Sequence, residues 1–239
     1  MDYNWNWGIL FQEPYFGWLI SGLQLTLGLA ACAWVIAFLW GSLLGIFRTT
    51  RIPALRGFAT AYVELFRGVP LLLQLFIWYF VVPELLPESA GMWMKRDMPQ
   101  PEFWTAVICL GTYTAARVAE QVRSGIGSIG GDLEKAGLAI GLTPFQNYVH
   151  VRLPLAYRII IPPLTSEFLT IFKNSSLALT IGVLELTAQS RQIENYTFQG
   201  FEAFTAATVL YLVITMAVVA LMRLVESRTR VRGLFHGER

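Results

Sequence analysis

The chain alternates between long apolar stretches and short polar connections. A transmembrane helix needs about 20 mostly apolar residues, each adding about 1.5 Å along the helix axis. Five stretches are long enough, so the pattern predicts an all-α integral membrane protein, a single domain over residues 1–239 with five transmembrane helices. The spans are expected at residues 18–47, 55–82, 103–122, 159–183 and 204–225.

Ionisable residues interrupt two of these spans. Arg117 and Glu120 lie in the third span, and Glu167 and Lys173 lie in the fourth. Between the fourth and fifth spans, residues 185–200 are polar enough to form a loop or a short interfacial helix.

The distribution of basic residues orients the spans. The only charged residues before Arg48 are acidic, and the loop at residues 83–102 carries a net charge of minus two. Because cytoplasmic loops are enriched in Lys and Arg, the N-terminus is predicted outside and the C-terminus inside. The same lack of early positive charge predicts no cleaved secretory signal. The basic residues lie in the first connection and in the tail: Arg48, Arg51, Arg56, Arg228, Arg230, Arg232 and Arg239.

The connection between the third and fourth spans, about residues 125–157, is polar and too long for a plain turn, and the topology places it in the cytoplasm. Asp132 is the expected N-cap of a helix at residues 133–140. Gly141 suits the left-handed position that follows a helix.

Thr143 and Pro144 then predict the N-cap and first residue of a second short helix, which runs to about Arg152 and is closed by Pro154. The two helices meet at a glycine elbow.

The second helix has an apolar face. Phe145, Tyr148 and Val149 recur on it at helical spacing. Such a face needs a partner, either the membrane ends of this chain or another protein.

The composition agrees with a membrane environment. Hydrophobic residues make up 55% of the chain and charged residues 14%, against roughly a quarter charged in soluble domains. A net charge of +2 gives no basic field for nucleic acid. Cys32 and Cys109 lie in apolar runs and show no metal-binding or disulfide spacing.

The sequence carries no enzyme signature. None of the lysines follows a glycine, so a phosphate-binding GxxxxGK[ST] loop is absent. His150 and His236 are far apart and have no carboxylate or cysteine at ligand spacing, so neither a metal site nor a catalytic dyad is expected.

Charges inside spans are costly and indicate a cavity, a polar interface or a paired charge. Glu64 and Arg67 are predicted to neutralise each other on one helix in preference to the alternative, contact with the substrate. Arg117, Glu120 and Arg123 form a ladder in which Glu120 satisfies only part of two guanidinium groups. Arg117 is therefore either an anion site with donors to spare or an arginine tied to Glu120 and to carbonyls.

Residues 137–154, GLAIGLTPFQNYVHVRLP, resemble the cytoplasmic loop of bacterial ABC importer permeases. Its usual form is Glu-Ala-Ala, three residues, Gly, and about nine residues before Ile-x-Leu-Pro. Aligning on Gly141 places Val151, Leu153 and Pro154 in the ending.

The resemblance also shows departures from the usual form. Lys135 occupies the usual Glu position, Ala136 matches, and Gly137 replaces the second Ala, while Glu134 lies one residue early.

Three further stretches look like the polar amino acid permeases of the histidine, glutamine and glutamate type. They are ELFRGVPLLLQLF at residues 64–76, TAARVAEQVRSG at 114–125 and KNSSL at 173–177. The arginine at position 117 looks most like the glutamate/aspartate permeases.

The resemblance implies a type I ABC importer of the bacterial inner membrane. Its expected partners are an ATP-binding cassette ATPase dimer, a second permease that is similar or identical, a periplasmic or lipid-anchored solute-binding protein, and membrane lipid. ATP and Mg are used by the ATPase, and no cofactor is expected on this chain.

Glu167 and Lys173 of the fourth span do not share a helix face, so each needs a partner elsewhere.

Two sets of site residues are predicted. The substrate path is predicted to include Arg117, Glu167, Asn174 and Ser175. The surface that couples to the ATPase is predicted to include Lys135, Ala136, Gly137, Gly141, Thr143, Pro144 and Phe145.

The alternatives are a permease for another polar amino acid such as glutamine or histidine, and a stand-alone secondary transporter or channel. Inverted repeats or broken helices at matching positions would favour the stand-alone transporter. An integral membrane enzyme would need clustered catalytic residues at one membrane face, which the sequence lacks.

Overall fold

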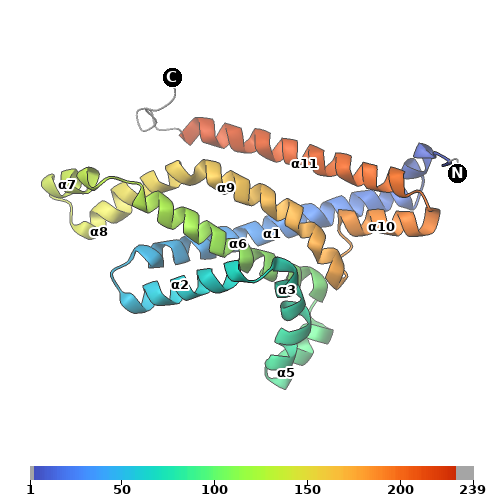
Figure 1. The fold of residues 1–239 in the computed structure, drawn as a ribbon, viewed down its shortest axis with the longest axis horizontal. Coiled ribbons are helices and arrows are strands. Elements are labelled where there is room, and N and C mark those ends of the chain that lie inside the picture. The colour runs from blue at the N-terminus through green and yellow to red at the C-terminus, as the bar shows by residue number, and fades with distance from the viewer. Residues whose placement is uncertain (1–2, 230–239) are drawn as a thin grey trace.

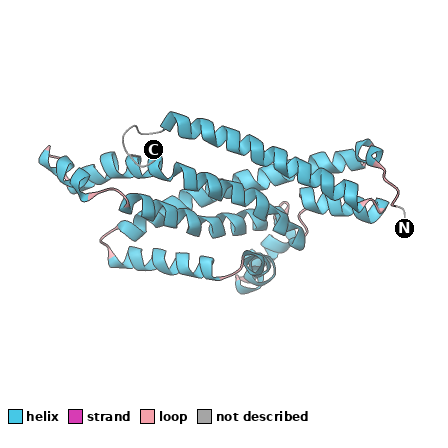
Figure 2. Cartoon of the chain, turned by 45° about the horizontal axis from the view of Figure 1, so that its top comes forward, coloured by secondary structure: helices cyan, strands magenta, loops and turns pink. Residues whose placement is uncertain are grey.

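The computed structural model describes residues 3–229, and within that range the chain is helical and has no strand (Figures 1 and 2). Short 3-10 or π-type turns cover residues 7–11, 77–81, 93–97, 148–152 and 176–181. The α-helices are α1 (Tyr15–Thr49), α2 (Pro53–Gly68), α3 (Leu71–Phe76), α4 (Val82–Leu85), α5 (Glu88–Met92), α6 (Pro101–Gly127), α7 (Gly131–Ala139), α8 (Pro144–Asn147), α9 (Leu153–Ser175), α10 (Leu186–Thr197) and α11 (Gly200–Thr229).

Three helical segments are long and apolar enough to cross a membrane. They are Tyr15–Thr49, Pro144–Ile181 and Gly200–Thr229. These segments match the predicted first, fourth and fifth spans. Each begins before its predicted start, and the first and fifth also continue past their predicted ends, whereas the fourth ends at Ile181, short of the predicted residue 183.

The third predicted span corresponds to α6, which lies at the centre of the bundle between α1, α2 and α9 (Figure 1). Ionisable residues lower the mean hydropathy of α6, and it is not among the three segments that are apolar enough to cross a membrane. It also buries more residues than any other helix in the described chain. A helix enclosed by other helices tolerates charge because protein, rather than lipid, surrounds it.

Small residues bring α1 and α6 into close contact. A Cβ added at Gly41 would lie 2.6 Å from the Cβ of Val118, and one at Gly45 would lie 2.6 Å from the Cβ of Val122. From the other side, a Cβ at Gly111 would lie 2.8 Å from the Cβ of Ile36. Small residues spaced four apart allow membrane helices to pack with their backbones close together.

The predicted second span at residues 55–82 is wrong as one continuous helix. The chain bends by 105° between Pro53–Gly68 and Leu71–Leu85. The residue before a proline is pushed out of the helical region, and Val69 before Pro70 is extended, with φ −106° and ψ 131°. The Nε2 of Gln74 donates to the carbonyls of Phe66 and Val69, both at 2.8 Å, and so satisfies groups that the break leaves free.

The second short helix of the cytoplasmic loop does not end at Pro154, and this prediction is also wrong. α8 continues through the π-turn Tyr148–Arg152 into α9, so that Pro144–Ile181 is one helical segment. The N–H of Leu153 donates to the carbonyl of Tyr148, five residues back. This wider turn directly before Pro154 relieves the clash that a proline ring makes in a regular α-helix.

The polar segment between the fourth and fifth spans is a helix, α10, one of the two predicted alternatives. Glu185 caps it by accepting hydrogen bonds from the N–H groups of Thr187 and Ala188 at 2.9 and 2.8 Å. α10 packs against α1 and α11 at the N-terminal end of the molecule, whereas α7 and α8 lie at the opposite end (Figure 1).

Candidate functional site

A small polar cavity of about 160 Å³ lies where α2, α6 and α9 meet. Its lining consists of Arg67, Arg117, Glu120, Gln121 and Glu167. Two of the predicted substrate-path residues, Arg117 and Glu167, therefore share one site.

Arg117 and Glu167 form an ion pair between α6 and α9. The Nε of Arg117 donates to Oε2 of Glu167 at 2.6 Å. The carboxylate is buried, with 8% of its side chain exposed, whereas 41% of the arginine side chain is exposed. Within residues 3–229 the guanidinium of Arg117 has Tyr113 as a further hydrogen-bond partner and no second carboxylate, so it has donors to spare.

Glu120 does not pair with Arg117, contrary to the predicted ladder. It pairs instead with Arg48 at the end of α1 and with Arg123 on its own helix. The helical spacing correctly predicted the pair of Glu120 with Arg123. The pair with Arg48 could not be predicted from spacing, because it depends on how α1 packs on α6.

Glu64 and Arg67 were predicted to neutralise each other, and this prediction is wrong. Both side chains are exposed, and they form no ion pair in the described chain. Arg67 instead contributes to the cavity wall, as the alternative of substrate contact requires. It lies one helical turn before the break at Pro70, on the helix facing α6.

Two guanidinium groups, those of Arg67 and Arg117, line the cavity together with the carboxylates of Glu120 and Glu167. Glu120 is paired with Arg48 and Arg123, which lie outside the lining, and Glu167 is paired with Arg117, so Arg67 has no carboxylate partner in the described chain. Excess guanidinium donors in a partly enclosed space are suited to carboxylate ligands, which arginine binds with strong, directional hydrogen bonds.

The other predicted path residues lie at the far end of α9. Ser175 is fully buried, and its hydroxyl donates to the carbonyl of Phe172 at 2.7 Å, while Asn174 is partly buried. Lys173 is exposed. None of the three lines the cavity that holds Arg117 and Glu167.

The elbow between α7 and α8 has the predicted glycine geometry. Gly141 has φ +90°. The N–H groups of Gly141 and Leu142 donate to the carbonyls of Leu138 and Gly137 at 3.0 and 3.1 Å, which is the Schellman pattern that ends a helix.

The helix starts in the elbow differ in how well they were predicted. Thr143 caps α8 and forms a capping box with Gln146, and Pro144 is the first helical residue, both as predicted. Asp132 is not the N-cap of α7, because that helix begins at Gly131 with Gly130 as its cap. Asp132 lies in the first turn instead, where a negative charge favours the helix dipole.

Three contacts fasten α7 to α8 and the turn that follows. Arg152 pairs with Glu134 at 2.9 Å, and the Nδ2 of Asn147 donates to the carbonyl of Glu134 at 2.8 Å. A Cβ at Gly137 would lie 2.6 Å from Oδ1 of Asn147. Buried Asn147 thus explains why glycine occupies a position at which the family's usual form has alanine.

Several predicted coupling residues are exposed. Lys135 has 81% of its side chain exposed and only a 3.4 Å contact with Asp132, and Ala136 is exposed beside it. Phe145 is 75% exposed. Tyr148, on the same predicted face, instead packs on this chain, with its hydroxyl 2.8 Å from that of Thr49. The apolar face is therefore divided between the two alternatives that its spacing left open.

Within residues 3–229 no group of three or more His, Cys, Asp or Glu side chains is arranged to hold a metal ion. Cys32 and Cys109 are free thiols, and Cys109 is buried. His236 and the tail residues Arg230, Arg232 and Arg239 lie outside the described residues.

A helical bundle with an elbowed loop at one end and an ionic cavity inside defines a membrane permease subunit. A family model described as "Binding-protein-dependent transport system inner membrane component" matches residues 37–231, and the chain belongs to this family.

Known proteins extend this assignment. The chain is 47% identical over 246 residues to the glutamate/aspartate import permease protein GltJ of Escherichia coli O6:H1 (strain CFT073), with all of both chains covered. It is 29% identical to GltK, a glutamate/aspartate import permease protein of the same strain, over 95% of this chain and 99% of that one. A crystal structure of an amino acid ABC transporter with histidines matches with a TM-score of 0.80 and 30% identity, covering 95% and 100% of the two chains. The fold is that of type I ABC importer permeases.

Proposed function

We propose that this chain is the permease of an ATP-driven importer for acidic amino acids, glutamate or aspartate. One observation carries the substrate class, namely that Arg67 and Arg117 line the cavity while its carboxylate Glu120 is already paired with Arg48 and Arg123. The high identity to GltJ supports the same class.

In this proposal Arg117 binds a substrate carboxylate. Its Nε remains on Glu167, and its two terminal nitrogens donate to the ligand. Only Oε2 of Glu167 is used by Arg117, so Oε1 can accept a hydrogen bond from the substrate ammonium group. Arg67 adds a second positive charge on the opposite helix and favours a substrate with two carboxylates.

The finer topology belongs to the same proposal. α6 and the bent pair α2–α3 complete five spans in the bacterial inner membrane, with the N-terminus outside. The positive-inside distribution of Arg48, Arg51 and Arg56 supports this orientation.

The partners are also proposed. The elbow around Gly141 and exposed Phe145 docks on a separate cytoplasmic ATPase, which holds the ATP and Mg. The second permease is a similar but different chain, as the two import permeases GltJ and GltK of one strain indicate for their own system. A solute-binding protein delivers the amino acid to the outer end. Asn174 and Ser175 remain candidates for the outer part of the path.

The proposal predicts a specific loss of transport when Arg117 is changed. Labelled glutamate uptake is measured in proteoliposomes that hold the complete complex, with ATP inside and the binding protein outside. Arg117→Gln removes a charge-assisted hydrogen bond worth about 1.5–3 kcal/mol, so uptake should fall roughly 10- to 100-fold. The glutamine amide can still donate a hydrogen bond to buried Glu167, so assembly and basal ATP hydrolysis should persist.

Arg96→Gln is the matched control, since it removes the same charge from an exposed position outside the cavity. Unchanged uptake by Arg117→Gln would contradict the assigned role. ATP-dependent uptake of histidine or glutamine in preference to glutamate would keep the importer and exclude the acidic substrate. Uptake without ATP would exclude the mechanism.

A further inference from the structure

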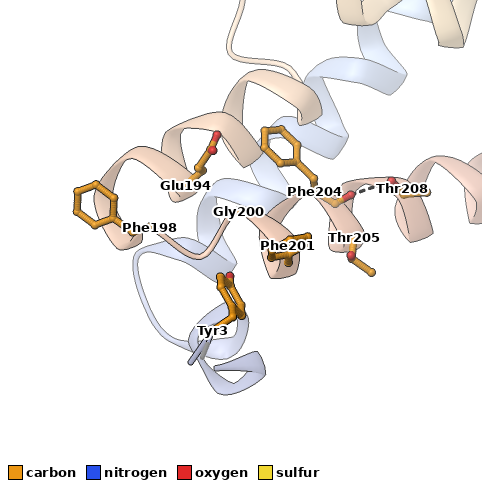
Figure 3. A pocket seen from close by; sticks show the side chains of 8 residues that line it. All are labelled: Tyr3, Glu194, Phe198, Gly200, Phe201, Phe204, Thr205 and Thr208. Carbon is orange, nitrogen blue, oxygen red and sulfur yellow. Dashed lines mark hydrogen bonds between the residues drawn. The ribbon is translucent and has the colours of Figure 1, made fainter. Parts of the chain in front are cut away.

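A second pocket, of about 500 Å³, lies at the other end of the molecule, where α10 turns into α11. Aromatic side chains from three segments surround it, Tyr3 from the N-terminal segment, Phe198 at the end of α10, and Phe201 and Phe204 at the start of α11 (Figure 3). The pocket is separate from the ionic cavity and shares no residue with it.

One carboxylate lies among these rings. Glu194 lines the pocket and is partly exposed. Its side chain forms no ion pair or hydrogen bond with a residue in the described range. A carboxylate surrounded by aromatic faces is a site for an organic cation, which the ring quadrupoles and the negative charge attract together.

Phe198 is held in an unfavourable conformation at the rim. Its φ is +58°, in the left-handed backbone region that residues other than Gly, Asn and Asp rarely adopt. The ring is also 84% exposed. Neither backbone preference nor burial in this chain accounts for a phenylalanine here, and strained positions of this kind concentrate at binding sites.

The pocket opens onto the least buried of the three apolar segments. After Phe204, α11 carries further exposed apolar side chains, those of Val209, Leu212 and Met216. Trp5 lies beside the pocket, with its ring 5.6 Å from that of Phe201. An aromatic cluster above an exposed apolar helix is typical of the membrane interface, where lipid headgroups meet acyl chains.

We propose that this pocket binds the ammonium headgroup of a zwitterionic phospholipid. The ammonium lies against Glu194 and the aromatic rings, the Thr205 hydroxyl is available to the phosphate, and an acyl chain follows the exposed face of α11. Continuity with the exposed apolar face of α11 favours a lipid over a basic side chain of another protein. The proposal is independent of the transported substrate.

Native mass spectrometry of the complete complex tests this site. The complex is released from nanodiscs that contain equal amounts of phosphatidylethanolamine and phosphatidylglycerol, and the two retained lipids are counted. A second preparation replaces phosphatidylethanolamine with phosphatidylcholine, which carries a quaternary ammonium. The wild-type complex should retain either ammonium lipid in preference to phosphatidylglycerol, and Glu194→Gln should reduce that preference roughly five-fold.

Phe198→Gly separates an effect on lipid binding from an effect on the stability of the fold. Glycine relieves the left-handed strain, so thermal stability should not fall, yet the loss of one wall should lower the preference for ammonium lipid. Glu88→Gln, an equal charge change at an exposed position on α5, should leave the preference unchanged.

Equal retention of the two lipids by the wild type would overturn the proposal, as would an unchanged preference in both pocket variants. If Glu194→Gln instead weakens binding of the solute-binding protein, the pocket accepts a basic side chain and the lipid assignment is wrong. If the variant separates the two permeases, the pocket is part of their interface and the assignment is equally wrong.

Discussion

Individual charged residues in this chain pair across helices more than along them. Arg117 reaches Glu167 on α9, and Glu120 reaches Arg48 on α1. A buried carboxylate that loses its guanidinium partner becomes very costly, so such pairs position helices as well as ligands. Pairing between helices leaves Arg117 only partly satisfied, and the proposed binding of a substrate carboxylate depends on these remaining donors.

At the residue scale, Gly141→Ala should impair coupling between ATP hydrolysis and uptake. The position has open space around it but a φ of +90°, so the added Cβ strains the backbone rather than a neighbour. A left-handed residue other than glycine costs about 1–2 kcal/mol, which shifts the population of the elbow roughly 5- to 30-fold. Uptake per ATP hydrolysed, measured in proteoliposomes, should fall accordingly.

Gly130→Ala provides the comparison, since that glycine has φ −61° and no atom within 4 Å of an added Cβ. Normal coupling in both variants would show that the elbow geometry does not transmit the ATPase movement.

At the element scale, the packing of α1 on α6 depends on small residues. Gly41 and Gly45 lie against Val118 and Val122 so closely that any side chain collides with α6. Because lipid is as apolar as the helix surfaces, this close fit replaces the hydrophobic drive that packs helices in water. The ion pair from Arg48 to Glu120 closes the same interface at one end.

Gly41→Ala should therefore destabilise the protein, although alanine has a higher helix propensity than glycine. The added Cβ would lie 2.6 Å from the Cβ of Val118 and 2.7 Å from the carbonyl oxygen of Ala115. Overpacking of this kind costs about 1–3 kcal/mol, and a lower melting temperature in detergent would report it. Gly57→Ala on exposed α2 has free space and should be neutral or stabilising by up to about 1 kcal/mol. Equal melting temperatures for the two variants would contradict the proposed tight interface.

At the scale of the whole molecule, the functional regions lie at different positions along the bundle. α7 and α8 of the elbow lie at one end of the bundle, and α10 lies at the other (Figure 1). The ionic cavity lies between α2, α6 and α9, and the aromatic pocket lies where α10 turns into α11.

The proposed orientation can be checked by cysteine labelling in cells. Cys32 and Cys109 are first replaced by alanine, and single cysteines are introduced as Phe11→Cys and Arg51→Cys, both at exposed positions. A membrane-impermeant maleimide should label Phe11→Cys in intact spheroplasts and Arg51→Cys only after permeabilisation. The reverse pattern would invert the topology and place the elbow outside.

The sequence by itself determined the membrane class, three of the helical spans, the glycine end of α7 and the capped start of α8. These features depend on local physics, namely the length of an apolar run, the left-handed preference of glycine and the hydrogen bonds of Thr143. Tertiary structure decided the rest. The bend at Pro70 is completed by Gln74, and Pro154 is accommodated by a π-turn. The partners of the ionisable residues depend on which helices lie side by side, which spacing along one helix cannot specify.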